Sequence, residues 1–210
     1  MRRTSPALLI ILGILVVLLF LGCGSYNNLV QSDETVKQAW GNVQSAYQRR
    51  ADLIPNLVET VKGEASFERG TLNDVINARA RATSMQVNPE NLTPENMQQF
   101  QQAQGQLSGA LSRLLVTVEQ YPTLRANDAF RDLQRQLEGT ENRINTERNR
   151  FNEVVQPYNV KVRSFPTNLF AGIMGFKVRP PFEASPGSEN APRVDFNTNQ
   201  PSVNFDSTGR

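Results

Sequence analysis

Histidine is missing from this chain of 210 residues, and cysteine occurs once, as Cys23. Without histidine there is no His-based catalytic triad, no imidazole metal ligand and no Glu-x-x-His pair of the kind that builds di-iron sites in helical bundles. One cysteine excludes an internal disulfide, and its position in an apolar N-terminal run leaves the rest of the chain without a thiol nucleophile. Gly-rich phosphate-binding loops are missing as well.

These absences leave chemistry by carboxylates alone, for which the candidates are Glu119, Glu138, Glu141 and Glu147. Charged residues on helices more often form a solvated face, so we predict no enzyme and no cofactor or metal. The 22 basic and 20 acidic residues give a net charge of +2, and no aromatic-studded basic stripe is present. We therefore predict no nucleic-acid partner. Alternation with period two over the length of a strand is also missing, so we expect no sheet.

The N-terminus carries the longest apolar run. Residues 1–6 form a basic flank with Arg2 and Arg3, and residues 7–23 follow with 17 uncharged residues. As a helix this run measures roughly 25 Å, slightly less than the ~30 Å hydrocarbon core of a bilayer. Two interpretations stay open: an uncleaved transmembrane anchor, or a lipoprotein signal cleaved before an acylated Cys23.

The residues before Cys23 match a lipoprotein signal only at Gly22, and the plain alternative for Cys23 is a small buried hydrophobe. Both anchoring routes give the same orientation. Basic residues beside a short anchor stay in the cytoplasm, whereas the first charges after the run, Asp33 and Glu34, are acidic. We therefore expect a single-pass or lipid-anchored protein of the inner membrane with its body outside the cytoplasm.

Apolar residues spaced alternately by three and four predict the first two helices. The first stripe is Val36, Trp40, Val43, Tyr47, Ile54, Leu57 and Val61, and the looser second stripe is Phe67, Leu72, Val75, Ile76, Ala82 and Met85. Arg50 occupies the one missing slot of the first stripe, and Gly63 closes that helix. Because Pro55 lies inside the pattern, we predict a kink near Ala51.

Two further helices are predicted after a break at residues 87–92. Thr93 is an N-cap before Pro94, and the third helix runs on to Pro122; its stripe is Met97, Phe100, Leu107, Leu111, Leu114, Val118 and Tyr121, with Gln104 in a polar slot. The fourth helix is capped by Asn127 or Asp128, and its stripe is Phe130, Leu133, Leu137, Ile144, Phe151, Val154 and Tyr158, with Thr140 and Glu147 interrupting it. The fold predicted for residues 26–163 is an all-α, antiparallel up-and-down four-helix bundle.

The chain changes character after Arg163. Residues 164–178 form an apolar extension, and residues 179–210 are rich in Pro, Asn and Ser. We predict a disordered tail there, because it has too little apolar surface to offset the entropy of ordering. Its large hydrophobes, Phe182, Phe196 and Phe205, are either docking points or isolated aromatics without a role.

Arg50, Gln104 and Glu147 lie in core positions of the predicted helices. A buried polar group costs stability unless it finds a partner. One interpretation is that the three pair with one another or with Glu138 and Glu141, which fixes the register of the helices. The other is a polar pocket or a seam that binds a partner.

Several segments resemble signature segments of the LemA family of bacterial membrane-anchored proteins. They are residues 26–30, 39–40, 47–58, 111–115, 119–122, 137–144 and 163–166. The resemblance implies a mostly helical four-helix domain behind one membrane segment, and it implies no catalytic residues. It also implies a body in the cytoplasm, which conflicts with the charge argument; we keep the charge argument.

We therefore predict a non-enzymatic, membrane-tethered helical module that binds another envelope or membrane protein. Its binding surface would be a helix face together with the apolar segment 169–176. A self-associating structural protein that forms homo-oligomers along the membrane is the alternative, and an enzyme that uses carboxylates alone is the third hypothesis.

Overall fold

The computed structural model describes residues 6–64 and 67–183, and for residues 6–23, 25 and 170 it describes the backbone alone. These residues form helices and no strand, so the prediction of an all-α fold is confirmed. The elements are α1 (Pro6–Lys62), α2 (Arg69–Ser84), a 3-10 turn η1 (Pro89–Asn91), α3 (Pro94–Val118), α4 (Pro122–Arg125), α5 (Asp128–Arg163) and α6 (Thr167–Ala171).

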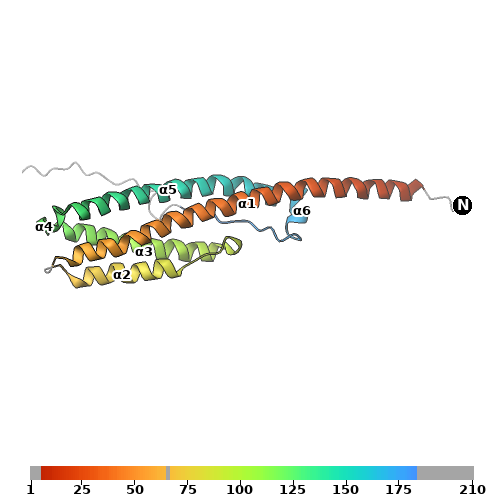
Figure 1. The fold of residues 1–210 in the computed structure, drawn as a ribbon. Coiled ribbons are helices and arrows are strands. Elements are labelled where there is room, and N and C mark those ends of the chain that lie inside the picture. The colour runs from red at the N-terminus through yellow and green to blue at the C-terminus, as the bar shows by residue number, and fades with distance from the viewer. Residues whose placement is uncertain (1–5, 65–66, 184–210) are drawn as a thin grey trace, which may run out of the picture.

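The four long helices lie side by side, and α1 extends beyond the others at one end (Figure 1). α1 packs most extensively along α5 and α2 along α3, and apolar residues of α3 and α5 share a core cluster. The short helix α4 lies at one end of this helical body, and α6 lies toward the other, beside α1 (Figure 1). The side chains of the buried stripes form two core clusters, one around Trp40 and one around Leu57 and Leu107.

Local sequence signals account for the helix boundaries. The Thr93 hydroxyl accepts a hydrogen bond from the backbone N–H of Asn96 at 3.2 Å, and the Asn127 side chain accepts one from Ala129 N at 2.9 Å, so both act as the predicted N-caps. The third helix ends at Val118, slightly earlier than predicted, and Pro122 opens α4. A proline fits that first position because its missing N–H would have no helical partner there.

Pro55 lies inside α1, which continues past it. A proline in this place leaves the carbonyl four residues before it, that of Ala51, without its helical donor. Arg79 of α2 supplies the missing donor, because its Nε lies 2.8 Å from the Ala51 oxygen. The carbonyl that Pro55 leaves without a helical donor thus forms a hydrogen bond between α1 and α2. The kink near Ala51 stays a prediction.

The segment of residues 176–183, called the strap below, runs in extended form along α5. Two asparagines of α5 each make a pair of hydrogen bonds with its backbone. The Asn159 side chain donates to Arg179 O at 2.7 Å and accepts from Arg179 N at 2.8 Å, and Asn152 does the same with Phe182 at 3.0 and 2.8 Å. Seven helical residues and three extended residues both cover about 10 Å, which is why the two spacings match.

The disordered tail was predicted to begin at residue 179, but residues 179–183 are part of the docked strap. Phe182 is buried, and its ring centroid lies 5.9 Å from that of Trp40 and 5.5 Å from that of Phe151. Arg179 is buried too, with Nη2 3.1 Å from Asp33 Oδ1 and Nη1 donating to Pro89 O at 2.6 Å. Arg179 and Phe182 therefore belong to the core of the helical body, and residues 179–183 are docked on it. The rest of the predicted tail, residues 184–210, lies outside the described residues.

Among the residues that the structure describes, no helix combines the length and the apolarity that crossing a membrane requires. Residues 1–5 and the side chains of residues 7–23, Cys23 included, lie outside the described part of the chain. The transmembrane and lipoprotein interpretations of this run both depend on those side chains.

Candidate functional site

Arg50 of α1 lies where the long helices meet, and its side chain is almost fully buried. Its Nη1 donates to the Ser108 hydroxyl of α3 at 2.8 Å and to Glu141 Oε2 of α5 at 2.9 Å, and its Nη2 donates to Gln104 Oε1 of α3 at 2.7 Å. The guanidinium also lies 5.1 Å from the ring centroid of Tyr47. A single planar cation thus connects α1 with both α3 and α5, for which the guanidinium fork is well suited.

Gln104 extends this network to the remaining long helix. Its Oε1 accepts from Arg50, and its Nε2 donates to the Ala82 carbonyl near the end of α2 at 3.3 Å. The predicted meeting of Arg50 and Gln104 is therefore present in the structure, and so is the contact of Arg50 with Glu141. The contact of Arg50 with Ser108 was not expected from the sequence, because a serine on a helix does not add to the periodic pattern of apolar residues.

Glu147 of α5 is separate from this network. Its side chain is 1% exposed, and the cations beside it are Arg143 and Arg150 of the same helix, with Nε 2.8 Å from Oε1 and Nη1 3.9 Å from Oε2. Within the described residues neither carboxylate oxygen accepts a hydrogen bond of good geometry. Pairing of the core polar residues with one another or with Glu138 and Glu141 is thus seen for Arg50 and Gln104, while the charges beside Glu147 come from its own helix.

An open cleft of about 320 Å³ lies beside Arg50, between α3 and α5. We call it the Arg50 cleft, and its lining residues are Arg50, Ser108, Leu111, Ser112, Leu115, Gln134, Leu137, Glu138 and Glu141. Leucines form much of its wall, and two carboxylates and a guanidinium supply the charge. α3 packs mainly on α2 and α5 mainly on α1, and the cleft opens between these two pairs of helices.

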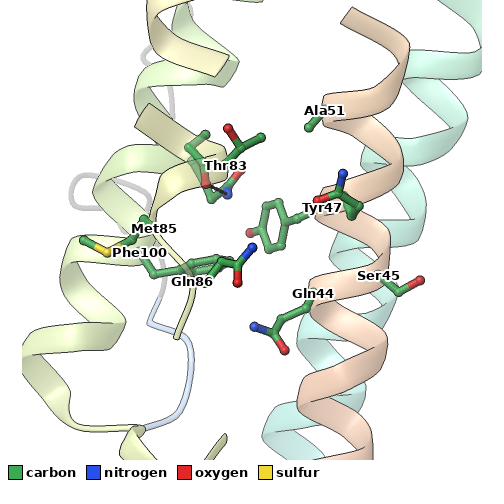
Figure 2. Close-up of a pocket in the computed structure, with 11 residues that line it drawn as sticks. Gln44, Ser45, Tyr47, Ala51, Thr83, Met85, Gln86 and Phe100 are labelled. Carbon is green, nitrogen blue, oxygen red and sulfur yellow. Dashed lines mark hydrogen bonds between the residues drawn. The ribbon is translucent and has the colours of Figure 1, made fainter. Parts of the chain in front are cut away.

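A second pocket of about 300 Å³ lies near Arg50, between α1 and the α2–α3 pair. Figure 2 shows the Tyr47 ring pointing from α1 into this pocket, with Gln44, Gln86 and Phe100 around it. Burial raises the pKa of the Tyr47 hydroxyl above its ordinary value, so it is neutral and can donate or accept a hydrogen bond. The pocket offers amide and hydroxyl groups without a charged side chain on its lining.

The four candidate carboxylates of the sequence are not gathered into one site. Glu138 and Glu141 line the Arg50 cleft, where Glu138 accepts a hydrogen bond from Gln134 Nε2 at 3.1 Å and Glu141 is paired with Arg50. Glu119 follows the last residue of α3, and Glu147 is buried between its own arginines. Among the described residues, no three His, Cys, Asp or Glu side chains are grouped so that they could hold a metal ion. The Arg50 cleft therefore offers a surface for binding, with leucine side chains on its walls and charged side chains at its edge.

A model of the LemA family matches residues 39–196, which is most of the chain and includes both the Arg50 network and the strap. The chain belongs to the LemA family. The resemblance to this family is thereby confirmed, and six of the seven sequence segments lie within the matched residues.

Characterised relatives are distant. MamQ 1 and MamQ 2 of Paramagnetospirillum magneticum, both named magnetosome proteins, are 26% identical over 181 residues, which cover 78% of this chain and 66% of theirs. The protein LemA of Metamycoplasma hominis is 23% identical over 181 residues, covering 86% of this chain and 77% of its own. The match thus spans slightly less than two thirds of the length of the MamQ proteins. Neither name, MamQ or LemA, denotes an enzyme.

Proposed function

We propose that this LemA family chain is a non-enzymatic, membrane-tethered module, an antiparallel up-and-down four-helix bundle that binds a segment of another envelope protein in the Arg50 cleft. The observation that carries the binding proposal is the cleft itself: an apolar-walled opening beside a buried cation that already connects α1, α3 and α5. The network holds the cleft walls in place, so a ligand meets a preformed site.

The membrane tether is proposed from the sequence of the N-terminus. Residues 7–23 are uncharged and follow Arg2 and Arg3, and α1 runs without interruption from this run into the helical body. We propose the inner membrane as the location, with the body outside the cytoplasm. A lipid anchor on Cys23 would hold the same body at the same surface, and the opposite orientation is the alternative.

The strap supports an extended peptide as the ligand. It shows that one side of α5 receives extended backbone, through Asn152 and Asn159. Glu141 precedes Asn152 by 11 residues, close to three helical turns, and therefore lies on the same side of α5. The Arg50 cleft is thus an open stretch further along a surface that already binds a chain segment in cis.

The charges of the cleft indicate the chemistry of the ligand. Glu138 and Glu141 bring two carboxylates against the one guanidinium of Arg50, and the walls are Leu111, Leu115 and Leu137. A segment with an apolar side chain next to a lysine or arginine would fill the wall and pair with the surplus carboxylate. Pairing of this kind at a cleft edge contributes mainly to specificity and association rate.

Photocrosslinking in native membranes tests this proposal with neighbouring positions. A benzophenone amino acid at Leu115 faces the cleft, whereas the same group at Val116, which is 62% exposed, faces away from it. We expect position 115 to capture a discrete partner through an apolar and basic segment, position 116 to capture none of it, and Glu138→Lys to abolish the capture. Equal capture at 115 and 116, or capture that Glu138→Lys leaves unchanged, would contradict cleft binding. Capture of a second copy of this chain alone would instead support the self-association hypothesis.

A further inference from the structure

The end of the helical body near residue 26 carries apolar side chains that face solvent. Phe165 is 80% exposed and Ile173 is 87% exposed, and Leu169, Met174 and Val178 are about half exposed. Together these five residues are called the α6 face. Single exposed hydrophobes are ordinary on a protein surface, but a group of five within fourteen residues indicates a contact surface.

The α6 face is held in place by buried neighbours. Ala171 is buried, and its carbonyl accepts a hydrogen bond from Phe176 N at 2.9 Å. Phe176 packs on Tyr26 of α1, with ring centroids 6.0 Å apart. Gly175 has φ 82°, a conformation that suits glycine and turns the chain back toward the body. The segment is thus fastened at both ends of the turn, and its other side chains are presented outward.

The contact between Phe176 and Tyr26 places the α6 face at a defined height along α1. Tyr26 follows Cys23 by three residues, which is about 4.5 Å along a helix. Figure 1 shows α6 beside α1 near the point where α1 leaves the other helices. If the apolar run 7–23 spans the bilayer, its end lies at the membrane surface, and an acylated Cys23 would lie there too. Both tethers therefore place the α6 face level with the bilayer surface.

Basic side chains accompany this face. Lys161 and Arg163 end α5 immediately before Phe165, and Lys177 lies between Met174 and Val178. The nearby acids of α1 are already paired: Asp33 with Arg179 and Lys37, and Glu34 with Lys37. Lys161 donates hydrogen bonds to Asn28 and Ser32 of α1, and within the described part of the chain Lys161, Arg163 and Lys177 are not in the ion pairs that hold these acids. Exposed apolar residues bordered by cations are typical of segments that lie in the headgroup region of anionic membranes.

We propose that the α6 face is a second membrane contact, which lies on the surface of the bilayer that holds the N-terminal tether. The proposal rests on the tether proposed above and adds to it a specific surface. A single helical tether leaves the tilt of the body over the membrane free, whereas two contacts fix it. Arg50 then stands at most about 36 Å above the level of Tyr26, since 24 helical residues separate them. The Arg50 cleft is thereby presented at a set distance from the membrane.

Tryptophan quenching by brominated lipids tests the second contact in the full chain. The native Trp40 is buried in the core and supplies a constant signal. We would place a new tryptophan by Ile173→Trp on the α6 face, by Leu15→Trp in the tether, or by Val116→Trp on α3, each in proteoliposomes of phosphatidylethanolamine and phosphatidylglycerol. Val116 is exposed and lies near the end of α3 that precedes α4, and α4 and α6 lie toward opposite ends of the helical body (Figure 1).

We expect strong quenching and a blue-shifted emission for Ile173→Trp and Leu15→Trp, and the native signal for Val116→Trp. Quenching at position 15 without quenching at 173 would overturn the second contact and leave the tether standing. Quenching at 173 without quenching at 15 would support the surface contact and contradict the tether. Equal quenching at 173 and 116 would show nonspecific adsorption and overturn the proposal.

Discussion

Replacing Phe182 with alanine removes an aromatic ring from the core of the helical body. The ring is buried against Trp40 and Phe151, and the guanidinium of Arg148 lies 4.8 Å from its centroid. Truncation of a buried phenylalanine to alanine costs about 3 to 5 kcal/mol. We expect the lower end, about 3 kcal/mol, because the strap lies outside the helices and can shift to close part of the cavity.

The strap itself sets an upper limit to this loss. Besides the Phe182 ring, it is held by four hydrogen bonds between its backbone and the side chains of Asn152 and Asn159, two donated by each side, and by the contacts of the Arg179 guanidinium. If the altered strap detaches while the helices stay folded, the loss cannot exceed the free energy with which the strap docks. For a chain of this size, 1 kcal/mol shifts the melting temperature by about 2 to 4 °C, so the expected decrease is about 6 to 12 °C.

Trp40 reports this change directly, since it is the one tryptophan of the chain. Thermal unfolding of Phe182→Ala would be followed by its emission, which we expect to shift to the red because the stacked ring no longer shields the indole. Ile173→Ala, at an 87% exposed position, is the matched control and should melt within about 2 °C of the native protein. If Phe182→Ala melts like this control with an unchanged emission maximum, the strap is not part of the core and the reasoning is wrong.

Three further predictions concern the network, the charge of the strap and the orientation. Arg50→Met should leave a folded protein but broaden its thermal transition, because the cation that sets the helix register is lost; an equally sharp transition would argue against a register role. Burial raises the pKa of Asp33, but hydrogen bonds and charge attraction from Lys37 and Arg179 together outweigh it, so the pKa lies below its ordinary value. The stabilisation that the ionised Asp33 gives the folded state is therefore present at neutral pH and is lost as the pH falls through this lowered pKa. In Asp33→Asn the free energy of unfolding should therefore decrease less steeply with falling pH, measured by denaturant unfolding between about pH 2 and pH 5, on either side of the usual carboxyl pKa of about 4. An unchanged pH profile would count against the pairing of Asp33 with Arg179 and Lys37. Protease added to intact spheroplasts should digest the body, and full protection would show that the charge argument for orientation is wrong.

The stripes of the four long helices and the N-caps of α3 and α5 could be predicted from the sequence because their signals are local. A stripe with spacings of three and four makes one face of a helix apolar, and Thr93 and Asn127 each cap the backbone N–H of a residue two or three positions away. Pro55 was correctly placed inside a continuing helix for the same reason, since the apolar stripe keeps its phase across it.

The strap could not be predicted, because composition describes the average of a segment and docking depends on single contacts. Residues 179–183 look like a disordered tail by their prolines and their few apolar residues, yet one phenylalanine finds a place between Trp40 and Phe151. The available signal was the pair Asn152 and Asn159, two turns apart on one helix, which only becomes informative once an extended segment is known to run beside it.

The sequence by itself determined that this chain is all-helical, that Arg50 and Gln104 occupy core positions, and that it is a LemA family member. Only the tertiary structure decided which charges meet. Arg50 and Glu141 are 91 residues apart in the chain, and Arg179 and Asp33 are 146 apart. Periodicity says which side of a helix faces inward, but the partner there depends on how distant helices pack. That is why Glu147, in the same core phase as the others, ends beside its own arginines and apart from the cleft.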